Sequence, residues 1–187
     1  DLLDGGGNVL APWFWDVASY ANAEAGVHVD LGITGQQDTV GAGKDTLVNI
    51  EGISGSAYDD ILRGNDSNNI LNILMGNAGD DILEGGLGVN FLKGGEGVDT
   101  ASYAHATAGV TVDLRNPLPQ ITGGAGIDTF SEIENLTGSV YNDTLTGDLS
   151  ANVLDGGAGD DVLNGKEGSD TYVSVSYTHL TLPTKRI

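Results

Sequence analysis

Aspartate residues recur at a fixed place in glycine-rich segments of this chain. Residues 76–102, GNAGDDILEGGLGVNFLKGGEGVDTAS, form three nines with Gly at the first and fourth places and Asp81, Asn90 and Asp99 at the sixth. Ca²⁺ takes roughly six to eight oxygen ligands, and a glycine turn exposes backbone carbonyls beside one carboxylate. The spacing therefore predicts calcium sites built from turns.

The spacing also predicts which turns share an ion. If successive turns lie on opposite edges of a coil, turns that stack are two nonapeptides apart and their acids differ by 18. The strongest candidates have that spacing: Asp81 with Asp99, and Asp143 with Asp161. Pairs spaced by 15 are expected to stack as well: Asp45 with Asp60, and Asp128 with Asp143.

The other edge is predicted to bind calcium more weakly. Asn152 is expected to face Asp170, and Asn90 to face Asn69. An amide offers an oxygen without a charge, which lowers affinity. The turn glycines complete the predicted metal-binding set: Gly76, Gly79, Gly94, Gly97, Gly156, Gly159, Gly165 and Gly168. The fifth-place acids Asp59, Asp80 and Asp160 are expected to be solvated rather than ligands.

Very short strands are expected to join these turns. Glycine at the first and fourth places supplies backbone conformations with φ > 0. The last three residues of each nine have an apolar middle residue, Leu83, Leu92 or Ala101, which indicates a strand with one inward side chain. Longer alternating strands are predicted at 27–31 and 110–114, each followed by a loop, at 32–39 and 115–122. The coarse prediction is an all-β solenoid.

The chain contains an internal duplication. Residues 16–72 align with 99–155 at a constant offset of 83, and three extra residues, Ile73–Met75, predict a bulge in the first copy. We expect a first module over 1–98, with repeats from 40 to 98, and a second over 99–174, with repeats from 123 to 173. Residues 175–187 break the pattern and resemble a translated sequencing adaptor, so we interpret them as a non-native tail.

The amino-acid composition favours cations as binding partners of this chain and argues against nucleic acid. The 187 residues include 30 Gly, no Cys, 27 acidic and 7 basic residues, for a formal charge of -20. So acidic a chain with few aromatics repels itself unless cations neutralise it, and it has no basic patch for nucleic acid. No apolar run is long enough for a membrane span. We find no nucleophile elbow, zinc-protease motif, phosphate loop or EF-hand loop, so we do not expect an enzyme active site.

Two adjacent segments, GGAGDDVLN (156–164) and GKEGSDTYV (165–173), resemble the G-G-x-G-x-D-x-U-x nonapeptide of RTX proteins, where U is a large apolar residue. The resemblance implies a right-handed parallel β-roll with several Ca²⁺ ions between stacked turns. It further implies type I secretion from a bacterium and a role in stabilising or displaying a larger protein. An alternative is a module that binds extracellular polysaccharide or a cell surface, with Trp13, Phe14 and Trp15 as first candidate contacts.

Overall fold

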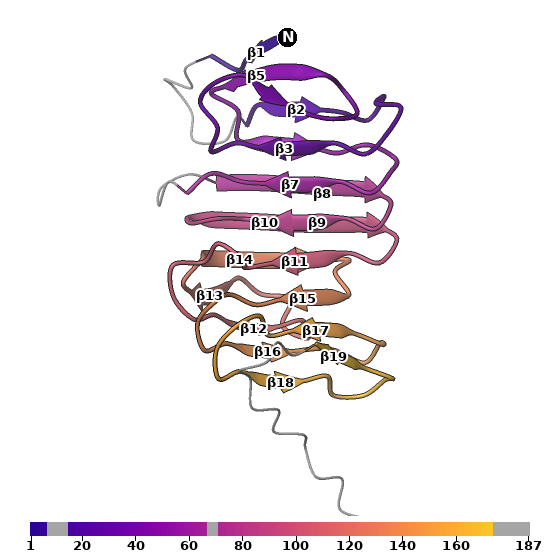
Figure 1. The fold of residues 1–187 in the computed structure, drawn as a ribbon, viewed down its shortest axis with the longest axis vertical. Helices are drawn as coiled ribbons and strands as arrows, with labels where there is room; N and C mark the ends of the chain where they lie inside the picture. The colour runs from indigo at the N-terminus through magenta and orange to yellow at the C-terminus, as the bar shows by residue number, and fades with distance from the viewer. Residues whose placement is uncertain (7–14, 67–70, 174–187) are drawn as a thin grey trace, which may run out of the picture.

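The computed structural model describes residues 1–6, 15–66 and 71–173, and these residues form a tall stack of short strands (Figure 1). No helix occurs among them, so none could cross a membrane. Most neighbouring strands are parallel, which confirms the all-β solenoid. The expected tail and the residues Trp13 and Phe14 lie outside the described part.

Two large sheets form the faces of the stack. The six-stranded sheet contains, in spatial order, β13 (Gln120–Gly123), β14 (Gly126–Ser131), β10 (Val89–Glu96), β8 (Leu71–Ala78), β6 (Gly52–Ser54) and β2 (Val17–Ser19). The seven-stranded sheet contains β19 (Thr171–Val173), β17 (Val153–Asp155), β15 (Asn135–Thr137), β11 (Thr100–Ser102), β9 (Ile82–Glu84), β7 (Ile61–Arg63) and β3 (His28–Asp30).

Two small sheets complete the fold. One contains β12 (Thr111–Asp113), β16 (Thr144–Thr146) and β18 (Val162–Asn164), all parallel. The other contains β1 (Leu2–Asp4), β5 (Lys44–Val48) and β4 (Gln37–Asp38). β1 pairs with β5 in parallel, so the stack extends to the first described residues.

The core is a column of single side chains. Leu83, Leu92 and Ala101 are each fully buried, as expected for inward-facing residues, although Leu92 lies in the longer strand β10 rather than in a three-residue strand. The flanking residues of these strands are on average more exposed, because alternate side chains point to opposite faces. With one buried apolar residue per short strand, the core supplies little hydrophobic stabilisation against the free-energy cost of burying the carboxylates.

The two copies use opposite faces of the stack. Strands β2, β6 and β8 lie in the six-stranded sheet, whereas their counterparts β11, β15 and β17 lie in the seven-stranded sheet. The chain moves from β9 through β10 to β11 by changing sheet at each step, so the second copy starts on the other side. Equivalent turns of the two copies therefore lie on opposite edges.

The predicted loops at 32–39 and 115–122 are partly strand. β4 and β13 run antiparallel to β5 and β14. Buried Gln37 and Gln120 hold these segments down, each exchanging two hydrogen bonds with the backbone of one residue, Asp30 or Asp113, at 2.8–2.9 Å. Because the inward positions of β4 and β13 include the polar Gln37 and Gln120, the sequence lacks the apolar alternation that predicts a strand.

The three extra residues of the first copy lie elsewhere than predicted. Residues Ile73–Met75 continue β8 in regular register with β6 and β10, and Leu74 is fully buried. Asn72 directly precedes them and pairs with Asn90. There is therefore no bulge at 73–75.

Glycine serves two purposes in the turns, and only one was expected. The fourth-place Gly79, Gly97 and Gly159 have φ of +116°, +141° and +132°, as predicted. The first-place Gly76 does not have positive φ; a Cβ there would instead collide with the Asp81 carboxylate and approach the Gly94 carbonyl oxygen. Close approach of the sixth-place side chain therefore requires glycine at the first place.

We expect Gly76→Ala to lower the free energy of unfolding by about 1–3 kcal/mol, because the added methyl must displace backbone or a buried carboxylate. Urea unfolding in saturating calcium measures this. Gly35→Ala is the matched control, because nothing lies within 4 Å of its Cβ position. Equal stability of the two variants would contradict the packing role of Gly76.

Candidate metal centre

Three carboxylates stack along the edge that joins β6, β8 and β10 to β7, β9 and β11. The backbone N–H of Asp60 donates to Asp81 Oδ1 at 2.8 Å, and the N–H of Asp81 donates to Asp99 Oδ1 at 2.9 Å. All three side chains are at most 1% exposed. The predicted stacking of Asp81 with Asp99 is confirmed, and Asp60 extends the same row.

The second copy repeats this arrangement on the opposite edge. The N–H of Asp143 donates to Asp161 Oδ1 at 3.0 Å. Along the other edge of this copy, the N–H of Asn152 donates to Asp170 Oδ1 at 3.0 Å. Both pairs, each spaced by 18, stack as the sequence predicted.

The pairs spaced by 15 do not stack, and this prediction was wrong. Asp60 and Asp143 instead accept hydrogen bonds on Oδ1 from the N–H groups of Val27 and Val110, both at 2.7 Å. These valines lead into β3 and β12, which pair directly with β7 and β16. The opening segment of each copy thus occupies the place next to the turn that the spacing had assigned to another acid.

Asp45 and Asp128 belong to strands rather than to the ends of turns. Asp128 lies on β14 in register with Asn90 on β10. Asp45 lies on β5, where its Oδ2 accepts the Thr39 hydroxyl at 3.3 Å.

The expected partner of Asn90 was also wrong. Asn69 lies outside the described residues, and the residue in register with Asn90 is Asn72, which is again 18 positions away. The sequence alignment misplaced the three extra residues and so concealed this spacing.

The stacked carboxylates carry buried oxygens with no partner. Among the described residues, Oδ2 of Asp81, Asp99 and Asp161 is buried without a hydrogen bond. The pKa of Asp81 is raised to about 7, chiefly by burial and also by the nearby Asp60 and Asp99 carboxylates, against the lowering effect of the Asp60 N–H. Burial likewise raises the pKa of Asp99 and of Asp161. These oxygens need either a proton or a cation.

Two other acids of the rows are already satisfied. Asp60 Oδ2 accepts the Ser56 N–H at 2.6 Å, and its Oδ1 accepts the Ser56 hydroxyl at 2.8 Å. Asp143 receives the same pair of bonds from Ser139 at 2.6 and 2.9 Å. A serine at the second place of the turn thus supplies hydrogen bonds to both carboxylate oxygens, whereas turns without that serine leave one oxygen without a partner.

The donor set fits a hard cation such as Ca²⁺. Each open Oδ2 lies beside a first-place glycine, and at Gly76 the Gly94 carbonyl oxygen of the next turn also comes close. Carboxylate and carbonyl oxygens are the ligands that Ca²⁺ prefers. Nowhere in the described ranges do three acidic or histidine side chains converge. A cation here would therefore be held by Asp81, Asp99 or Asp161 together with turn carbonyls.

Sequence reasoning missed two glutamates. Glu134 Oε2 accepts the N–H of Asp99 at 2.8 Å and so takes the role of the next carboxylate in the row. Glu51 does the same for Asp16 at 3.0 Å. The duplication in the sequence could have indicated these two residues, because Glu51 and Glu134 occupy equivalent positions at the offset of 83.

The fifth-place acids form a second, outer ladder. Asp59 Oδ1 accepts the N–H of Asp80 at 2.9 Å, and Asp80 Oδ1 accepts the N–H of Val98 at 2.9 Å. Both side chains are exposed, so they are solvated, as expected, while also linking successive turns.

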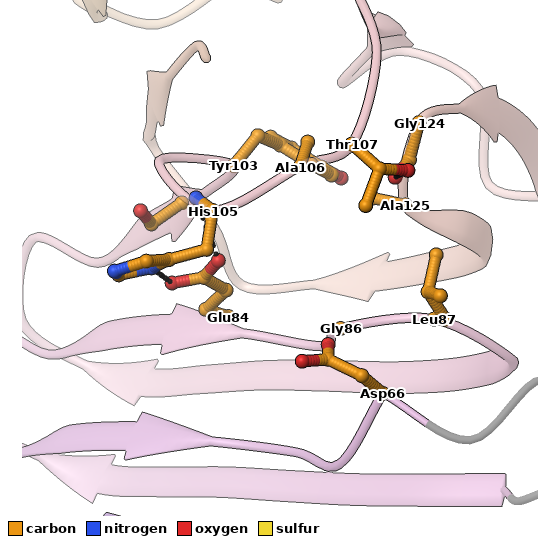
Figure 2. Close-up of a pocket in the computed structure, with 11 residues that line it drawn as sticks. Asp66, Glu84, Gly86, Leu87, Tyr103, His105, Ala106, Thr107, Gly124 and Ala125 are labelled. Atoms are coloured by element: carbon orange, nitrogen blue, oxygen red, sulfur yellow. Dashed lines mark hydrogen bonds and ion pairs between the residues drawn. The ribbon is translucent and has the colours of Figure 1, made fainter. Parts of the chain in front are cut away.

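A small pocket marks the junction between the copies (Figure 2). Glu84 of the first copy accepts the backbone N–H of His105 at 3.0 Å and contacts its Nδ1 at 2.8 Å. The pocket has a volume of only about 10 Å³, which suits a single water. The exposed His105 is therefore part of a surface contact between the copies.

Comparison with known families agrees with this geometry. The family model of the RTX calcium-binding nonapeptide repeat matches four copies, at residues 53–72, 72–101 and 137–172. The stacked strands and turns thus define a calcium-binding β-roll. Over these segments the chain carries RTX-type calcium-binding nonapeptide repeats. No curated protein matched it.

Without calcium, stability should fall as the pH rises from about 4 to about 7. The folded-state pKa of Asp81, about 7, lies above its ordinary value of 3.8, so the folded state holds the proton more tightly. The contribution of Asp81 to the free energy of unfolding is full below about pH 4 and is lost as the pH rises through 7. Urea unfolding in EGTA across this range measures the slope.

Asp81→Asn should flatten that slope, because an amide at this position has no charge to bury. Saturating calcium should flatten it in the unaltered chain. A slope that neither change reduces would show that Asp81 does not carry the effect.

Proposed function

We propose that this module folds when calcium neutralises its stacked carboxylates, and that in doing so it stabilises or displays a larger secreted protein. The carrying observation is the set of buried, unpartnered Oδ2 atoms on Asp81, Asp99 and Asp161. A metal that binds only the folded turns adds its binding free energy to folding.

The balance of forces supports coupling between binding and folding. The formal charge of -20 opposes compaction, and the core offers only one apolar side chain per short strand. Bound Ca²⁺ replaces repulsion between neighbouring turns with attraction to a shared ion. Each turn then becomes favourable only when the next turn supplies the other ligands.

The same balance suits a protein that crosses from a calcium-poor to a calcium-rich compartment. Cytosolic calcium would leave the carboxylates in repulsion, whereas extracellular calcium, in the millimolar range, would fill even weak sites. We propose an extracellular, bacterial location and a non-catalytic role, with any catalytic domain in another part of the parent protein.

Replacing both Asp81 and Asp99 with Ala should raise the calcium concentration needed for half-maximal folding by tenfold or more. The reason is that two neighbouring turns lose their charged ligands while the rest of the stack keeps its own. Circular dichroism of residues 1–173 during a calcium titration measures the midpoint.

Glu24→Ala with Glu167→Ala is the matched control, since it removes two charges from exposed side chains outside the rows. Its midpoint should stay within about twofold. Strand content already complete in EGTA would refute calcium-coupled folding. Equal midpoints for the two double variants would refute the assignment of Asp81 and Asp99.

A second candidate function is binding of extracellular polysaccharide, and one groove favours it. The groove crosses β3, β7 and β9, has a volume of about 360 Å³ and a floor that includes the exposed Ile61 and Ile82. Asp30, Arg63 and Glu84 form an ion-paired rim beside this floor. The apolar floor suits the C–H face of a sugar ring, and the polar rim suits the hydroxyl groups around its edge.

Ile61→Ser with Ile82→Ser should lower retention on immobilised polysaccharide at least tenfold if the groove binds sugars, because the apolar contact is lost. Retention is measured by pull-down in calcium. Val153→Ser with Val162→Ser, at exposed strand positions away from the groove, is the control. Unchanged retention of the groove variant would exclude this site.

A further inference from the structure

One row of the stack contains two amides and one carboxylate. Asn72 on β8, Asn90 on β10 and Asp128 on β14 occupy neighbouring strands in register and are each at most 1% exposed. Asn72 Nδ2 donates to Asn90 Oδ1 at 2.8 Å, and Asn90 Nδ2 donates to Asp128 Oδ1 at 2.6 Å. The row is thus a continuous chain of hydrogen bonds between side chains.

The end of the row is closed by a tyrosine. The Tyr103 hydroxyl donates to Asp128 Oδ2 at 2.9 Å, so both oxygens of Asp128 have partners. No atom of these four side chains is among the buried groups that lack a partner in the described structure. This contrasts with Asp81, Asp99 and Asp161, whose Oδ2 atoms remain open.

The amide nitrogens also occupy the oxygen-rich positions between turns. Asn72 Nδ2 lies 3.0 Å from the Gly85 carbonyl oxygen and 3.2 Å from that of Asn65. Asn90 Nδ2 lies 3.0 Å from the Gly86 carbonyl oxygen. These carbonyls belong to turns, where a cation would otherwise find its ligands. An N–H donor supplies the positive end of a dipole there without any need for an ion.

We propose that the row Asn72, Asn90, Asp128 and Tyr103 is a calcium-free seam that holds the two copies together. It joins β8 and β10 of the first copy to β14 of the second, and its donors and acceptors are matched within the protein. The ligand set does not fit Ca²⁺, because Asn72 and Asn90 are neutral and all three side chains of the row are already bonded.

The seam gives the roll a part that does not depend on calcium. Strands β8, β10 and β14 are paired over their length, and β8 and β10 are the longest strands of the fold (Figure 1). With the seam in place, calcium completes turns on either side of a pre-formed centre. This inference rests on the proposed calcium binding, and it specifies a part of the roll that binds no calcium.

Converting an amide to a carboxylate should create a calcium site. In Asn90→Asp the new carboxylate lies against Asp128 and repels it, so the variant should bind one more Ca²⁺ than the unaltered chain, and its unfolding temperature in EGTA should fall. Native mass spectrometry at saturating calcium counts the ions. Asn72→Asp, whose row neighbour stays neutral, is a milder second variant with the same expected gain.

Asn116→Asp is the control, because Asn116 is exposed and its Oδ1 accepts only the Leu118 N–H, a role that Asp can fill. Its ion count and unfolding temperature should not change. Asn90→Ala should lower the unfolding temperature in EGTA without changing the ion count.

Three outcomes separate the two proposals. An unaltered chain that binds no calcium would refute the proposed function. A chain that binds calcium but loses an ion in Asn90→Ala would refute only the seam, because Asn90 would then be a ligand. The seam is equally overturned if both carboxylate variants bind the same number of ions as the unaltered chain.

Discussion

Direct stacking of identical turns is the constraint on which this structure depends. Each coil places its sixth-place side chain beside that of the next coil, and the backbone N–H of one turn uses one oxygen of the neighbouring carboxylate. The second carboxylate oxygen is then buried, and it lies close to the negative charge of the neighbouring carboxylate in the row. Because the core is thin, this electrostatic demand has to be met locally, turn by turn.

The molecule meets that demand in three ways. Rows containing Asp81, Asp99 and Asp161 leave an oxygen that suits a cation. At Asp60 and Asp143, a serine two residues into the turn supplies hydrogen bonds instead. At the centre of the stack, amides join strand to strand. The backbone geometry is nearly the same in all three, so the side chain at one or two places decides whether a turn needs an ion.

Duplication distributes these solutions over the whole stack. Because the second copy begins on the opposite sheet, its open carboxylate at Asp161 lies on the other edge from Asp81 and Asp99. The two copies therefore do not concentrate their charge along one side. The contact between Glu84 and His105 and the hydrogen bond from Asn90 to Asp128 both lie where the copies meet.

The nonapeptide period by itself determined the all-β solenoid, the inward Leu83 and Leu92, and the stacking of Asp81 with Asp99, because turn conformation and strand alternation are local properties. Only the tertiary structure decided that β12 pairs with β16, that Asn72 pairs with Asn90, and that Gly76 is required by the Asp81 carboxylate. These depend on residues brought together from different coils. Whether a carboxylate is left open or satisfied follows from the second place of its own turn, but that the open oxygen is buried was visible only in the tertiary structure.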